Sequence, residues 1–303
     1  MTIIGRITAC LETDTGLVRD HNEDHVDFWE PKTQEEEAKH GWLYLVADGV
    51  GGADAGEIAS QYASQRTIMH YLESEEQIDW GQRILDAMQA ANTDLRQLVL
   101  DHHNGSRMAT TMVAAVLQES RLFISNVGDS RGYHWRNGRL QQITKDQSLV
   151  AKLLEEGAIT EEEARNHPRK NVILYSLGSE NQPHIDLFEF TWEPGDILFL
   201  CSDGLTKHIT DDEISKIIST ESPKNAANTL IELANERGGE DNISVAVVQY
   251  QSSKITNQAK EKAVDTAAPL IPPQYRTAMW LFTLVLSFIQ SILTFLVWFF
   301  LRV

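Results

Sequence analysis

The chain has 303 residues, of which 42% are hydrophobic and 23% are charged. This composition excludes collagen-like, low-complexity and wholly disordered chains, and it provides enough apolar material for a buried core. The formal net charge of −18 repels a phosphate backbone, so we expect no nucleic-acid partner. Two scattered cysteines, Cys10 and Cys201, do not make a disulfide framework and favour a reducing compartment.

Residues 1–250 have the pattern of one globular unit. Apolar runs of strand length lie at Trp42–Ala47, Leu122–Val127, Ile197–Cys201 and Ile243–Tyr250. Two longer segments, about Glu57–Leu72 and about Trp80–Leu100, have the periodicity and composition of helices. Because strands occur in clusters and helices in pairs, the pattern indicates a layered α+β fold.

The C-terminal part of the chain differs from the globular unit. Residues 251–277 are rich in Lys, Gln, Ala, Thr and Pro and are predicted to be a linker. Residues 278–301 contain no charged side chain, and a helix of this length can cross a hydrocarbon core of about 30 Å. We therefore expect a single C-terminal transmembrane helix over 278–301. Basic residues precede it and only Arg302 follows it, so the positive-inside rule predicts a membrane protein whose globular domain is cytoplasmic.

One side of this predicted helix is polar. At 100° per residue its polar side chains fall within one arc, and they are Thr283, Ser287, Gln290, Ser291 and Thr294. A polar stripe of this kind favours a helix–helix partner in the membrane, which is either a second copy in a homodimer or another membrane protein. Alternatively, the hydroxyl groups bond to carbonyl groups of their own helix.

Aspartates recur where the apolar runs meet the surface. Asp48 and Asp203 each follow a run and precede glycine, Asp129 follows a third run, and Asp241 lies just before a fourth. A single Asp-Gly pair commonly begins a turn. Four carboxylates at the rim of a rigid sheet instead favour a site for hard divalent cations such as Mg²⁺ or Mn²⁺.

Several other kinds of chemistry lack support in the sequence. There is no GxxxxGK[ST] or GxGxxG segment for a nucleotide, and no HExxH segment for zinc. There is no GxSxG nucleophile turn either, and Cys201 lies in an apolar run that disfavours a thiolate.

Eight segments, in one order, resemble the motifs of the metal-dependent protein phosphatases of type 2C, the PPM family, in their bacterial form. They are Arg19–Asp24, Val46–Ser60, Thr110-Thr111, Asn126–Arg131, Thr144–Asp146, Asn171–Gly178, Ser202–Gly204 and Asp241-Asn242. The resemblance covers about residues 5–250. It implies a four-layer α-β-β-α sandwich, in which helix pairs flank two antiparallel sheets.

The resemblance also implies an activity and its partners. Family members hydrolyse phosphoserine and phosphothreonine in proteins with two or three Mn²⁺ or Mg²⁺ ions. Such ions neutralise a phosphate dianion and activate water at neutral pH. The expected partners are therefore a phosphoprotein substrate and an opposing Ser/Thr kinase, at the membrane in this chain.

Residue roles follow from the same resemblance. It implies metal-binding roles for Glu23, Asp24, Asp48, Gly49, Asp129, Asp203 and Asp241. Asp48 bridges two ions, one of which also takes the Gly49 carbonyl oxygen, while Asp203 and Asp241 bind the other. Glu23 and Asp24 act through metal-bound waters. Asp129, together with Asp203, holds a weaker third ion.

Arg19 is expected to clamp the substrate phosphate with both arms of its guanidinium group, so Arg19 and Asp48 are the expected catalytic residues. One departure from the animal-type pattern is Val50, which replaces a histidine that is a candidate general acid. The intact carboxylates and Arg19 favour an active enzyme. The alternatives are a pseudophosphatase or membrane scaffold that binds phosphoproteins, and a phosphatase domain of a stress-response switch.

Overall fold

The computed structural model describes residues 5–51, 55–74, 79–102 and 108–251. The chain divides into two units, Met1–Ser252 and Ser253–Val303, and the described residues all belong to the first. Its helices are α1 (Gln34–His40), α2 (Ala55–Glu73), α3 (Trp80–His102), α4 (Leu149–Glu155), α5 (Glu161–Arg165), α6 (Asp203–Thr206), α7 (Asp211–Thr220) and α8 (Pro223–Glu236). Its strands are β1 (Ile7–Asp14), β2 (Asp24–Trp29), β3 (Trp42–Gly51), β4 (Met108–Thr110), β5 (Met112–Gln118), β6 (Arg121–Val127), β7 (Arg131–Arg136), β8 (Arg139–Gln142), β9 (Asp186–Thr191), β10 (Ile197–Cys201) and β11 (Ile243–Tyr250).

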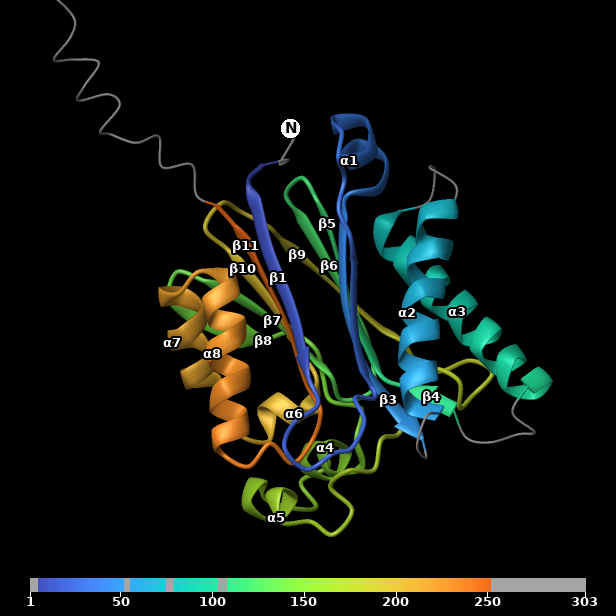
Figure 1. Cartoon of the computed structure of the whole chain (residues 1–303), viewed down its shortest axis with the longest axis vertical. Helices are drawn as coiled ribbons and strands as arrows, with labels where there is room; N and C mark the ends of the chain where they lie inside the picture. The colour runs from blue at the N-terminus through green and yellow to red at the C-terminus, as the bar shows by residue number, and fades with distance from the viewer. Residues whose placement is uncertain (1–4, 52–54, 75–78, 103–107, 252–303) are drawn as a thin grey trace, which may run out of the picture. The chain divides into compact units, whose positions relative to one another are not determined.

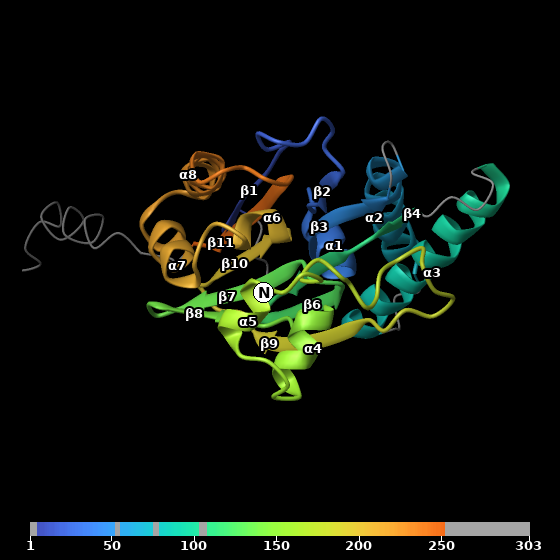
Figure 2. The same cartoon turned by 90° about the horizontal axis from the view of Figure 1, so that it is seen from below.

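Two antiparallel sheets form the middle of the unit. One has the strand order β1-β11-β10-β7-β8, and the other has the order β2-β3-β5-β6-β9 with β4 paired to β3. Helices α7 and α8 lie on one side and α2 and α3 on the other, so the layers run helix, sheet, sheet, helix (Figures 1 and 2). The α+β class with two antiparallel sheets and flanking helices, predicted from the sequence, is confirmed.

The central strands are apolar on both faces because both faces are buried. In β3, Leu43 and Leu45 contact the core beneath α2 and α3, whereas Tyr44 and Val46 belong to the core between the two sheets. Strands β10 and β11 alternate in the same way between the inter-sheet core and the core beneath α7 and α8. Since successive side chains of a strand point to opposite faces, such strands appear in the sequence as unbroken apolar runs.

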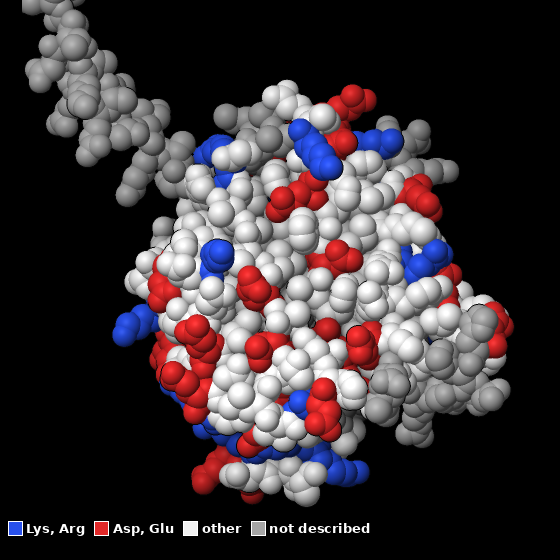
Figure 3. Space-filling view, viewed as in Figure 1, with Lys and Arg blue, Asp and Glu red and all other residues white. Residues whose placement is uncertain are grey.

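The segment with α4 and α5 lies at the same end of the sandwich as α6 (Figure 1). Both helices begin at residues that cap them: Ser148 accepts a hydrogen bond from the Ala151 amide, and Thr160 forms a capping box with Glu163. In the space-filling view, acidic side chains are spread over the face, and basic side chains gather at the lower end near α5 (Figure 3).

The membrane localisation predicted from the sequence is contradicted. Among the helices of the described residues, none is both long and apolar enough to cross a membrane. Even α3, with 23 residues, carries charged side chains such as Arg83, Asp94 and Arg96. The segment 278–301, its polar stripe and residues 252–277 of the predicted linker lie outside the described residues. The prediction of a single-pass membrane protein with a cytoplasmic domain is corrected on this ground.

Candidate metal centre

Acidic residues from distant parts of the sequence lie close to one another around α6, which Figure 1 shows at one end of the sandwich. Asp24, at the start of β2, pairs in register with Asp48 of β3. The charges of Asp203 and Asp129 reach Asp48 strongly enough to raise its pKa, as do those of Asp24 and Asp241. The structure thus brings together the five aspartates that the sequence singled out.

Asp48 is held by the Thr110-Thr111 pair. The Asp48 carbonyl accepts hydrogen bonds from the Thr111 amide at 2.8 Å and from Thr110 Oγ1 at 2.9 Å. The Asp48 amide donates to Thr111 Oγ1 at 3.2 Å. The strand predicted over Trp42–Ala47 is longer in the structure, because β3 continues past Asp48 to Gly51 by pairing with β4. Asp48 is therefore fixed inside a strand, so its backbone is held rigidly.

Close backbone packing sets Glu23 beside β3. The Glu23 carbonyl accepts hydrogen bonds from the Gly49 amide at 3.0 Å and from Ser60 Oγ of α2 at 2.6 Å. A Cβ atom at Gly49 would lie 2.2 Å from the Gly56 carbonyl oxygen, so only glycine fits there. The side chain of Glu23 in turn lies against Gly56, whose added Cβ would be 2.6 Å from Glu23 Oε1.

Asn242 ties Asp241 to the N-terminal segment, and its role was not foreseen from the sequence. Its Oδ1 accepts a hydrogen bond from the Glu23 amide at 2.8 Å, and its Nδ2 donates to the carbonyls of Thr15 and His21 at 2.8 and 2.9 Å. A Cβ atom at Gly204 would lie 1.9 Å from the Asn242 carbonyl oxygen. The Asp203-Gly204 and Asp241-Asn242 pairs are therefore packed directly together.

Asp129 lies in a tight turn after β6. Gly128, with φ of 101°, donates from its amide to Gln147 Oε1 at 2.9 Å, and its carbonyl accepts from the Gln147 amide at 2.9 Å. An added Cβ atom at Gly128 would lie 2.5 Å from Thr111 Cγ2. Thr111 thus bonds to the backbone of Asp48 and also packs against Gly128, the residue before Asp129.

Ionisation of the clustered carboxyl groups is unfavourable, mainly because they are removed from water and to a smaller extent because their charges repel one another. Burial raises the pKa of Asp48 well above its ordinary value, and the charges of neighbouring aspartates raise it further. Burial is also the main cause that raises the pKa of Asp24 to about 7 and that of Asp129 to about 7. The pKa of Glu23 is raised by burial as well. Such a cluster favours cations.

Two cationic side chains already bind part of the cluster. Arg19 Nη2 lies 2.7 Å from Asp241 Oδ1, and Lys207 Nζ lies 2.7 Å from both Asp241 Oδ2 and Asp203 Oδ2. Burial opposes ionisation of Asp241, but the hydrogen bond and charge of Lys207, the charge of Arg19 and the Asn242 amide together outweigh it and lower the pKa of Asp241. The sequence motifs do not predict a role for Lys207, although it stands four residues after Asp203.

The residues fit a hard divalent cation in their chemistry. Their donors are all oxygens, which Mg²⁺ and Mn²⁺ prefer. Asp24 Oδ2 and Asp129 Oδ1 are buried without a hydrogen-bond partner in the described part of the chain, and a cation would supply one. As the side chains stand, no group of three or more acidic, His or Cys residues among the described ones is arranged to hold a metal ion. Asp203 binds Lys207, and Asp241 binds both Lys207 and Arg19.

Comparisons with known proteins agree with this picture. A profile described as "Protein phosphatase 2C" matches residues 21–237. The serine/threonine phosphatase stp of Listeria innocua is 38% identical over 248 residues, covering 80% of this chain and 95% of the relative. The crystal structure of the Mycobacterium tuberculosis serine/threonine phosphatase PstP/Ppp has a TM-score of 0.71 at 35% identity and covers 81% of this chain and 99% of its own. A catalytic domain of PstP in complex with 2 manganese ions has a TM-score of 0.69 at 34% identity, with coverages of 81% and 99%.

A two-sheet sandwich with an oxygen-rich acidic rim at one end defines a metal-dependent phosphatase. The chain belongs to the protein phosphatase 2C family. The prediction of a metal-dependent serine/threonine protein phosphatase, made from the sequence motifs, is thereby confirmed.

Proposed function

We propose that the acidic rim of this phosphatase holds two or three Mn²⁺ or Mg²⁺ ions and that Arg19 binds the phosphate of a phosphoprotein. In this assignment Asp48 and the Gly49 carbonyl would hold one ion, and Asp48, Asp203 and Asp241 would hold the other. Glu23 and Asp24 support them through water, and Asp129 joins Asp203 at a weaker third position. The observation that carries the proposal is geometric: Asp24 pairs in register with Asp48, and Asp24 Oδ2 and Asp129 Oδ1 are buried without a hydrogen-bond partner in the described part of the chain.

The bound ions supply an activated water and neutralise the charge of the phosphate. The chain's own part is to hold the oxygen donors rigidly, since Asp48 lies within a hydrogen-bonded strand and Asp203 begins α6 directly after β10. Arg19, with a side chain that is 46% exposed, is placed at the open edge, where a guanidinium group can bind two oxygens of an incoming phosphate. No covalent intermediate with the protein is required.

The substrate class is a protein that carries phosphoserine or phosphothreonine, which implies a Ser/Thr kinase that opposes this enzyme. The assignment of a catalytic domain to residues 1–250 belongs to the same proposal and is supported by the described unit and by the profile match over 21–237. The alternative, a pseudophosphatase that binds phosphoproteins without hydrolysing them, predicts the same fold but no turnover.

The decisive experiment measures phosphate release from a phosphothreonine peptide by the full-length chain, with Mn²⁺ and with a chelator. Wild type should be active only with the metal ion. Asp48→Asn should lower kcat on the order of 10³-fold while the chain stays folded, and Asp212→Asn on the exposed surface of α7 is the matched control. Peptide binding without turnover in wild type would establish the pseudophosphatase instead, and near-normal activity of Asp48→Asn would remove Asp48 from the centre.

A further inference from the structure

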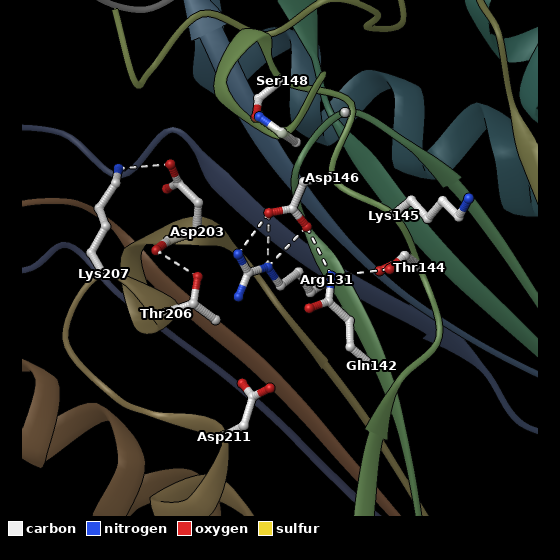
Figure 4. A network of polar contacts seen from close by, with 12 residues as sticks. Arg131, Gln142, Thr144, Lys145, Asp146, Ser148, Asp203, Thr206, Lys207 and Asp211 are labelled. Carbon is white, nitrogen blue, oxygen red and sulfur yellow. Dashed lines mark hydrogen bonds and ion pairs between the residues drawn. The ribbon is translucent and has the colours of Figure 1, made fainter. Parts of the chain in front are cut away.

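Lys207 bridges the two carboxylates to which the proposed function assigns one metal ion. Its ammonium nitrogen is 2.7 Å from Asp203 Oδ2 and 2.7 Å from Asp241 Oδ2. Figure 4 shows Lys207 extended toward Asp203 along the rim. A position between two carboxylates, with an oxygen of each as its partner, is also the position that a divalent cation would take there.

The local fold builds this bridge, so it is more than an accident of a long surface side chain. Lys207 is the C-cap residue that follows α6, and its amide donates to the Asp203 carbonyl at 3.0 Å. One helical turn therefore presents both the carboxylate and the ammonium group on one side. The Lys207 side chain is only 23% exposed, which shields the pair from water and salt more than at an open surface.

Asp241 is neutralised from two sides. Lys207 binds its Oδ2, while Arg19 binds its Oδ1 at 2.7 Å. Arg19 is the more exposed of the two cations, with 46% of its side chain accessible. Arg19 can therefore turn toward a phosphate at the open edge, whereas Lys207 is held over the carboxylates by α6.

We propose that Lys207 is an internal counter-ion that competes with the divalent cation for Asp203 and Asp241 and so sets the metal concentration that this phosphatase requires. The inference rests on the proposed function, because it takes these two aspartates as metal ligands. Without metal, the ammonium group offsets the repulsion between the two carboxylates. To bind there, the cation must displace it, which weakens metal binding and stabilises the metal-free chain.

The test is calorimetric titration of MnCl₂ into the chelator-treated full-length chain. Lys207→Met should bind Mn²⁺ about tenfold more tightly than wild type, which is about 1.4 kcal/mol. Its thermal midpoint in chelator should be lower than that of wild type, and Mn²⁺ should restore it. Lys207→Arg, which keeps the charge, should retain the wild-type affinity. Lys216→Met, on the exposed face of α7, is the matched control and should change neither quantity. Lys207→Gln takes the place of Lys207→Met if the methionine variant does not fold.

Asp203→Asn separates failure of this inference from failure of the proposed function. If Asp203→Asn loses Mn²⁺ binding but Lys207→Met binds no more tightly than wild type, the competition is refuted and the metal centre stands. If Asp203→Asn binds Mn²⁺ like wild type, Asp203 is not a metal ligand and the inference about Lys207 falls with it. A purely structural role for Lys207 would lower stability without tightening metal binding.

Discussion

Acidic groups near the two ends of strand β10 differ in how they are paired. At its start, the Asp196 side chain is 2% exposed and accepts hydrogen bonds from Arg136 Nε at 2.8 Å and Arg136 Nη2 at 2.6 Å. His134 Nε2 lies 3.0 Å from it as well. Just past its other end, Asp203 belongs to the rim with Asp24 and Asp129, which have buried oxygens without a partner among the described residues.

The pKa values of these buried carboxyl groups depend on whether a cationic partner binds them more than on how deeply they are buried. Burial opposes the ionisation of Asp196, but the hydrogen bonds from Arg136 and the Glu193 amide, together with the contact to His134, outweigh it and hold the pKa of Asp196 below the ordinary value. For Asp24 and Asp129 nothing comparable outweighs burial, and each pKa rises to about 7. A paired buried carboxylate supports the fold, whereas a cluster of unpaired ones costs stability and provides a binding site for cations.

The largest expected effect on stability belongs to the paired end. Asp196→Asn leaves the Arg136 guanidinium without its carboxylate and should lower the free energy of unfolding by about 3 kcal/mol. The activity of each folded molecule should be unchanged, because Asp196 lies at the end of β10 remote from the rim. Urea unfolding followed by circular dichroism measures the loss. Glu193→Gln is the control, since Glu193 also pairs with Arg136 at 3.3 Å but is 60% exposed and should matter little. Loss of activity in folded Asp196→Asn would contradict the separation of the two ends.

The next largest effect separates the roles of Arg19, which is proposed to bind substrate, and Arg136, which stabilises the fold. Arg19→Ala should lower kcat/KM for a phosphopeptide by roughly 10- to 100-fold, because the phosphate loses its guanidinium contact. The affinity for Mn²⁺ should change less than the affinity for substrate. Arg136→Ala, at the opposite end, should instead lower stability and leave kcat/KM unchanged. Steady-state kinetics, together with a Mn²⁺ titration, separates these outcomes, and unchanged kinetics in Arg19→Ala would remove Arg19 from the site.

Sequence patterns predicted β3, β6, β10 and β11, which are buried on both faces, but they missed β5, which is buried in the same way. The bounds expected for Ile197–Cys201 and Ile243–Tyr250 are those of β10 and β11, because their apolar runs end where burial ends. Strands with mixed composition were missed. In β7, Arg131–Arg136, charged and aromatic residues alternate without an apolar run, yet the strand is held by pairing with β10 and β8. That pairing joins segments far apart in the chain and leaves no local signal.

The candidate metal centre likewise has residues that the sequence predicted and residues that it did not. The aspartates were predicted because each follows or precedes an apolar run and fits a family motif. The bridge from Lys207 to Asp241 was not predicted. Asp241 comes near α6 because β11 pairs with β10 in the folded sheet, and the local sequence carries no sign of that pairing. Asn242 is a similar case: its three hydrogen bonds reach Thr15, His21 and Glu23, which the sequence places more than 200 residues away.

The smallest expected effect tests the unpaired end by pH. A carboxyl whose pKa is higher in the folded than in the unfolded chain binds a proton more strongly when folded. Its contribution to stability is therefore present at low pH and is lost as pH rises from the ordinary value of 3.8 to about 7. We expect the metal-free chain to lose stability over this interval, and Asp129→Asn to regain about 1 kcal/mol at pH 7. Asp196 acts in the opposite sense, because its lowered pKa removes stability only as the solution becomes strongly acidic.

Urea unfolding in chelator between pH 4.5 and 7.5 distinguishes the two groups, with the exposed Asp212→Asn as control. Added Mn²⁺ should flatten the wild-type profile, because a bound cation replaces the proton as the partner of the carboxylates. A profile for metal-free Asp129→Asn as steep as that of wild type, and no more stable at pH 7, would show that Asp129 does not share in the repulsion at the rim.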